Sequence, residues 1–142
     1  MDSNSAAFTL LDHTADLGIM VTGSDLRDLF EKAAHSMMQI MIQERPTGKT
    51  SSLQLSVSGE DYADLIVRWL GEILYLFQGE DKIVTCAEIS SISQSHINAT
   101  LQTVPFNPKQ HEVLAEIKAV TYHRIEVICE NGCWKATIIF DL

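Results

Sequence analysis

Two stretches of the chain carry apolar residues at helical spacing. The first follows Thr22-Gly23-Ser24, where Ser24 can cap a helix. Its apolar stripe covers roughly five turns and consists of Leu26, Leu29, Phe30, Ala33, Met37, Ile40 and Met41. The second opens at Gly59-Glu60-Asp61, has Gly79 as a candidate C-cap, and buries Ile66, Trp69, Leu70, Ile73, Leu74 and Phe77. The pattern predicts two amphipathic helices.

The polar face of the second helix carries Asp64, Arg68 and Glu72 at successive steps of four residues. This is the spacing of solvated ion pairs on a helix surface, which we take as the first interpretation. A functional acidic face is the alternative.

The remaining apolar residues mostly alternate with polar ones, which is typical of half-buried strands. Such segments precede the first helix, separate the two helices and follow the second helix: 8–11, 17–21, 53–57, 83–89, 97–101 and two further strands near the C-terminus. The order is two strands, helix, strand, helix and four strands. It predicts an α+β fold in one domain over residues 1–142, with a mixed or antiparallel sheet packed against both helices. Residues 1–7 are expected to be a flexible lead.

The C-terminus contains the strongest turn signal of the chain, Asn131-Gly132, between two strand-like runs. A two-residue turn places Glu130 opposite Cys133 and, if the strand 117–130 is regular, Tyr122 opposite Asp141. In that register Lys118 shares the face of Asp141, and His123 lies on the apolar face, where a buried neutral histidine is expected. The sequence therefore predicts a C-terminal β-hairpin that ends at Asp141.

The charge of the chain limits its partners. A formal charge of −9 disfavours non-specific nucleic-acid binding and is compatible with a cation or a basic protein partner. No signal peptide is recognisable at Met1–Ser5, and no apolar run is long enough to span a membrane. Cys86, Cys129 and Cys133 lack zinc-site spacing. We therefore expect a cytoplasmic protein with reduced thiols.

Two anionic clusters lie at opposite ends of the chain. Asp12-His13-Thr14-Ala15-Asp16-Leu17-Gly18 places two carboxylates and an imidazole between strands, either in a functional loop or in a turn capped by its own side chains. Asp141 and the α-carboxylate of Leu142 form a second cluster, which a cation or an Arg or Lys partner would neutralise. Because both clusters lie on elements that should be anchored, we predict that Asp16 and Asp141–Leu142 meet in space.

Three motifs, in this order along the chain, resemble the signatures of the archease family. They are Asp12-His13-Thr14-Ala15-Asp16-Leu17-Gly18, Glu116-Ile117-Lys118-Ala119-Val120-Thr121-Tyr122-His123, and the C-terminal run from Trp134 to Leu142. The helix with Trp69-Leu70-Gly71-Glu72 fits the same family. The resemblance covers nearly the whole chain.

The resemblance implies an accessory protein rather than an enzyme. Archeases activate the tRNA-splicing RNA ligase RtcB by promoting its guanylylation and multiple turnover, without ligating RNA themselves. By the same resemblance, Asp16, Asp141 and the terminal residue Leu142 bind a divalent metal, and Lys118 takes part in activation. His13 and Asp12 are candidates for supporting these ligands. The terminal residue is often Ile in the family, and Leu142 retains its backbone oxygens.

The expected metal is calcium, with Mg²⁺ or Mn²⁺ as alternatives, because hard oxygen ligands suit these ions better than zinc. The expected partner is an RtcB-type ligase, not nucleic acid or a membrane. The runner-up is a stand-alone metal-dependent hydrolase or phosphotransferase that uses Asp16 and Asp141 on the metal and His13 as base. The chain has no P-loop and no nucleophile elbow, which argues against that alternative. A third hypothesis is a structural adaptor with a stabilising ion.

Overall fold

The computed structural model describes residues 8–11, 16–43 and 46–142. Asp12 and His13, and the expected flexible lead 1–7, lie outside the described residues. In chain order the elements are β1 (Phe8–Leu11), β2 (Asp16–Gly23), α1 (Leu26–Met41), β3 (Ser51–Ser58), α2 (Tyr62–Glu80), β4 (Lys82–Ile92), β5 (His96–Pro105), β6 (Ala119–Val120), β7 (Glu126–Glu130) and β8 (Cys133–Asp141).

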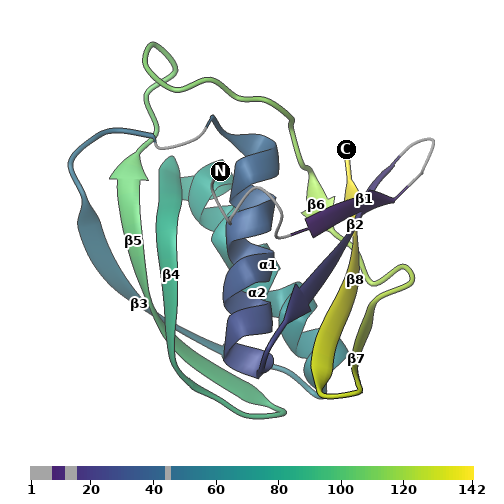
Figure 1. Cartoon of the computed structure of the whole chain (residues 1–142). Coiled ribbons are helices and arrows are strands. Elements are labelled where there is room, and N and C mark those ends of the chain that lie inside the picture. Colours follow the sequence, from purple (N-terminus) through teal and green to yellow (C-terminus); the bar gives the residue numbers. More distant parts are fainter. Residues whose placement is uncertain (1–7, 12–15, 44–45) are drawn as a thin grey trace.

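Two separate antiparallel sheets flank the helices (Figure 1). One has the order β1-β2-β8-β6, with β7 also paired to β8, and the other has the order β3-β5-β4. Helix α1 contacts β2 and β8 of the first sheet and β4 of the second, and α2 contacts β3, β4, β6 and β7. The α+β class and the two packed helices are confirmed. The strands form two sheets because each face of the helix pair needs an apolar cover.

The core lies between the layers. Trp69 is fully buried on α2, and its indole N–H donates to the main-chain oxygen of Phe30 on α1 over 2.9 Å. Ile138 and Phe140 of β8 close the core from one side, and Leu101 of β5 closes it from the other. The hydrogen bond satisfies the polar atom of the indole where water cannot reach it. No helix in the described part of the chain has the length and apolar character that a membrane crossing requires.

Aspartates, rather than the predicted residues, cap the helices. Asp25 is the N-cap of α1, where its carboxylate accepts from the N–H of Asp28 over 2.8 Å. Ser24 instead donates its N–H to the Asp28 carboxylate over 2.9 Å, which completes a reciprocal pair of the capping-box type. Helix α2 has Asp81, in a left-handed conformation with φ of 53°, as its C-cap, and not Gly79. The prediction of Ser24 and Gly79 as caps was therefore wrong.

The C-terminal hairpin is confirmed in its first half. β7 and β8 pair from Glu130–Cys133 to Glu126–Thr137, and Asn131 and Gly132 have φ of 52° and 76°, as a two-residue hairpin turn of type I′ requires. The register was therefore predicted correctly over the whole of β7.

The second half of the predicted strand is interrupted. Residues 121–125 leave the sheet in a turn in which Ile125 donates its N–H to the oxygen of Tyr122 over 3.2 Å, and Arg124 has φ of 55°. When pairing resumes in β6, Ala119 and not Tyr122 lies opposite Asp141. The predicted register beyond β7 was therefore wrong, His123 is exposed rather than buried, and five strands instead of four follow α2.

Candidate functional site

The first residue of β2 lies opposite the last residue of β8. The two strands form an unbroken antiparallel ladder from Gly23–Trp134 to Asp16–Asp141. Side chains of directly opposite residues share one face of a sheet, with Cβ atoms about 4.5–5.5 Å apart. The prediction that Asp16 and Asp141 meet in space is confirmed, and the part of Leu142 in this site stays a prediction.

The C-terminal end of β8 is held by hydrogen bonds on both sides. β8 pairs with β2 on one side and with β6 and β7 on the other. Lys118 donates its N–H to the main-chain oxygen of Asp141 over 2.7 Å, and Thr121 donates its N–H to the oxygen of Ile139 over 3.0 Å. Phe140 is fully buried between these contacts. The carboxylate of Asp141 therefore starts from a fixed backbone, with Leu142 one residue beyond.

Lys118 is tied to this site through its main chain. Besides its bond to Asp141, its own oxygen accepts from the side-chain amide of Gln78 at the end of α2 over 3.1 Å, and the oxygen of Ile117 accepts from the same amide over 3.0 Å. Its side chain is exposed. The prediction that Lys118 and Asp141 share a face assumed a regular strand over residues 117–130. That strand is interrupted, and a main-chain hydrogen bond connects Lys118 to Asp141 instead.

The paired carboxylates have no basic partner among the described residues. The four ion pairs of that part of the chain involve the acids Asp28, Asp64, Glu80 and Glu130. Two carboxylates opposite each other in a sheet repel unless a cation lies between them. The donors are all oxygens, which fits a hard divalent cation.

The described side chains alone do not complete such a site. They contain no group of three His, Cys, Asp or Glu residues placed to hold a metal ion. A cation at Asp16 and Asp141 would therefore need oxygens of Leu142, water, or ligands from outside the described residues, where Asp12 and His13 lie.

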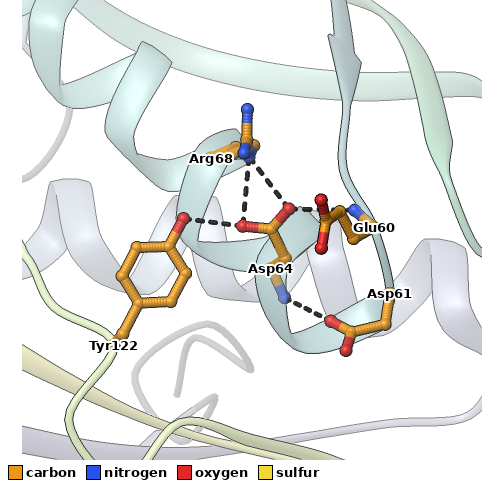
Figure 2. A network of polar contacts seen from close by, with 5 residues as sticks. All are labelled: Glu60, Asp61, Asp64, Arg68 and Tyr122. Carbon is orange, nitrogen blue, oxygen red and sulfur yellow. Dashed lines mark hydrogen bonds and ion pairs between the residues drawn. The ribbon is translucent and has the colours of Figure 1, made fainter.

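A second polar network holds the 121–125 turn against α2 (Figure 2). The carboxylate of Asp64 accepts from the hydroxyl of Tyr122 over 2.6 Å, from the N–H of Glu60 over 2.9 Å and from Nε of Arg68 over 2.9 and 3.0 Å. These bonds, led by that of Tyr122, lower the pKa of Asp64 from 3.8 to about 2. The Asp64–Arg68 ion pair was visible in the sequence at i,i+4 spacing, whereas the Tyr122 contact had no sequence signal.

This network positions the neighbouring site. Tyr122 lies two residues after the end of β6, the strand that pairs with Asp141, and Lys118 directly precedes that strand. The bond to Asp64 therefore fixes one end of the segment 118–122 on α2, and Gln78 fixes the other.

Comparison with known proteins gives one consistent family. The sequence model described as "Archease protein family (MTH1598/TM1083)" matches residues 8–142. The chain is 29% identical to the protein archease of Methanosarcina mazei over the whole length of both chains. It is 30% identical to the protein archease of Methanothermobacter thermautotrophicus, with 95% of this chain and 98% of that protein covered.

Solved structures share the fold. The solution structure of Methanobacterium thermoautotrophicum protein 1598 matches with a TM-score of 0.71 and 28% identity, covering 96% of this chain and 99% of that one. The crystal structure of an archease from Thermotoga maritima, described as a possible chaperone, matches with a TM-score of 0.68 at 20% identity, covering 93% of this chain and 94% of that one. At that identity the second match shows the fold alone.

Proposed function

This chain belongs to the archease family, and from that premise we propose that it is a non-catalytic accessory protein that activates an RtcB-type tRNA-splicing RNA ligase. In this function it promotes guanylylation of the ligase and allows multiple turnover. The observation that supports the proposal most directly is the cross-strand pair of Asp16 and Asp141, with Lys118 hydrogen-bonded to the main chain of Asp141.

The proposed metal ligands are Asp16, Asp141 and the terminal carboxylate of Leu142. Ca²⁺ is the expected ion, with Mg²⁺ or Mn²⁺ as alternatives, because every donor is an oxygen. A bound cation would supply charge neutralisation where two strand ends bring carboxylates together. Asp12 and His13, close in sequence to Asp16, are proposed to support this site.

The proposed contact with the ligase includes Lys118. Its side chain is exposed, and its N–H is bonded to the oxygen of Asp141 over 2.7 Å. A displacement of the Asp141 backbone is therefore transmitted to Lys118 without an intervening side chain. This arrangement provides a physical route by which the state of the carboxylate pair influences activation.

The proposed partner is the ligase protein and not its RNA substrate. A formal charge of −9 opposes binding to phosphate and is compatible with a basic protein surface. The three cysteines are free thiols, which suits the proposed location in the cytoplasm.

The test is a reconstituted ligation reaction with an RtcB-type ligase, GTP, Mn²⁺ and cleaved RNA. We expect guanylylated ligase and repeated turnover only when this protein is added. Asp16→Asn, Asp141→Asn and Lys118→Ala should each reduce activation at least tenfold, whereas Glu130→Gln, a charge-matched change elsewhere on the same sheet, should not.

The protein alone separates this proposal from a stand-alone phosphotransferase. We expect no covalent label from GTP and no joined RNA in the absence of ligase. Labelling of this chain by GTP without ligase would refute the accessory function and support the enzyme alternative.

The contribution of the chain end can be tested separately. One added C-terminal glycine moves the carboxylate away and leaves a neutral amide at Leu142, so it should weaken Ca²⁺ binding and activation, while an N-terminal glycine should not. Full Ca²⁺ affinity and activation with the C-terminal extension would remove Leu142 from the ligand set.

A further inference from the structure

The two edge strands of the three-stranded sheet, β3 and β4, differ in how their outward main-chain groups are covered. On the β4 edge, Ala87 donates its N–H to Nε2 of His35 over 3.1 Å, and Ile89 donates its N–H to Oε2 of Glu31 over 2.8 Å. β4 is also interrupted by two register shifts. Covering side chains and bulges are the means by which proteins keep an edge strand from pairing with another chain.

The β3 edge has none of these protections among the described residues. Its pairing with β5 is unbroken from Ser51 to Ser58, and the segment contains no charged residue and no proline. Among the described residues, only those of β5 form hydrogen bonds with the main chain of β3. Every second main-chain N–H and C=O of β3 is therefore directed outward without a partner from this part of the chain.

A groove runs between this edge and α2. It is lined by Ser56, Val57 and Ser58 of β3 and by Arg68, Gly71 and Glu72 of α2, with a cavity volume of about 410 Å³. The strand and the helix follow each other in the chain, joined by residues 59–61, and they are in contact. Residues of the edge strand therefore form one wall of the groove, and residues of the helix form the other.

No described residue requires a glycine at position 71. A Cβ added there would meet no described atom within 4 Å, whereas one added at Gly79 would lie 2.6 Å from the ring of Tyr75 and one added at Gly59 would lie 2.8 Å from the backbone of Leu65. Glycine inside a helix is destabilising relative to alanine. The missing side chain leaves the groove open.

We propose that this groove binds an extended basic segment of a partner protein, which adds to β3 as a fourth strand of the sheet. The eight residues of β3 match a segment of similar length, and strand addition beside a helix obtains affinity from main-chain hydrogen bonds. This inference concerns the other sheet from the Asp16–Asp141 pair and does not rest on activation of a ligase.

The charges of the groove and of the whole chain favour a basic segment as the bound partner. Arg68 is paired with Asp64, while Glu72 is exposed and has no ion-pair partner among the described residues. A Lys or Arg of the bound segment can neutralise Glu72. A second copy of this chain is disfavoured because each copy has a formal charge of −9.

In the experiment, a library of random nine-residue peptides is selected for binding to the immobilised full chain. The affinity of each recovered peptide is then measured by titration. We expect sequences rich in β-branched residues with at least one Lys or Arg. Hydrogen–deuterium exchange should slow at the main chain of β3 when such a peptide binds, because its outward N–H groups become paired.

Two substitutions at one position separate binding from stability. Gly71→Ala and Gly71→Gln should both raise the melting temperature by about 3 °C, since both residues favour helix more than glycine does. Only the glutamine fills the groove, so it should weaken peptide binding at least tenfold while the alanine variant binds nearly as the wild type. Glu72→Gln should weaken the basic peptides severalfold at low salt, and Glu88→Gln on the opposite edge strand should not.

Three results would overturn the proposal. The first is that no selected peptide binds the wild type more tightly than it binds Gly71→Gln. The second is binding that leaves exchange in β3 unchanged. The third is self-association of the wild type that Gly71→Gln abolishes, which would assign the groove to a second copy of this chain.

Discussion

Removing one charge from the Asp16–Asp141 pair should stabilise the metal-free protein. Asp141→Asn keeps the shape of the side chain and abolishes the repulsion between two carboxylates that lie opposite each other in the sheet. Two unit charges about 6 Å apart in water repel by roughly 0.7 kcal/mol, and like charges directly opposite in a sheet are destabilising. We therefore expect the free energy of unfolding to rise by about 0.5–1 kcal/mol.

This change is large enough to measure. An unfolding entropy of about 2.1 cal/mol/K per residue gives roughly 0.3 kcal/mol/K for 142 residues. The melting temperature of Asp141→Asn in chelator and low salt should therefore be about 2–3 °C above that of the wild type. In 1 M NaCl the Debye length falls to about 3 Å, and most of the difference should vanish.

The matched control is Glu130→Gln, which makes the same chemical change in a carboxylate that lies 3.6 Å from the ammonium of Lys135. This variant loses an attraction, so its melting temperature should stay level or fall slightly. Added Ca²⁺ should stabilise the wild type and Glu130→Gln but not Asp141→Asn. A melting temperature of Asp141→Asn at or below that of the wild type in chelator, at low salt, would show that the two carboxylates do not repel as the register requires.

Three other predictions follow from single contacts. Tyr122→Phe should raise the pKa of Asp64 from about 2 toward its ordinary value of 3.8, as measured by NMR titration of the carboxyl carbon; an unchanged pKa would mean that the hydroxyl is not bonded in solution. Burial lowers the pKa of His35 below 6.5, so the unfolded chain binds the proton first, and stability should decline as the pH falls from 6.5 toward the lower folded pKa. His35→Gln should flatten this part of the pH dependence in thermal melts, and an identical slope in both proteins would contradict it. Trp69→Phe loses a buried hydrogen bond and part of a buried ring, so denaturant titration should show a loss of about 1.5–3 kcal/mol, and a loss below about 0.5 kcal/mol would show that the contact between the helices contributes little.

Local patterns in the sequence were sufficient for the elements that depend on local chemistry. Both helices were predicted because their apolar stripes repeat at 3.6 residues, and that periodicity is a property of each segment alone. The β7–β8 hairpin was predicted with its register because Asn131 and Gly132 adopt positive φ readily. The N-cap of α1 was assigned to Ser24 instead of Asp25 because serine and aspartate are both good N-caps. The hydrogen bond from the N–H of Ser24 to the carboxylate of Asp28, which places Ser24 before the cap, is visible only in the structure.

The interruption at 121–125 could not be predicted from local patterns. Tyr122, His123 and Arg124 include no glycine, proline or asparagine to indicate a turn. The turn is instead held by a hydrogen bond from Tyr122 to Asp64, which lies 58 positions away in the chain. Contacts of such separation depend on the packing of whole elements, and a pattern read along one segment contains no information about them.

The candidate sites divide in the same way. The sequence by itself determined which residues are charged at the two ends of the chain, and the anchoring expected of those ends placed Asp16 near Asp141. Only the tertiary structure decided that Ala119 is the other neighbour of Asp141 and that Lys118 is joined to it through the backbone. It alone revealed the open edge of β3 beside Gly71, because an unpaired edge and an empty groove are defined by what does not pack there.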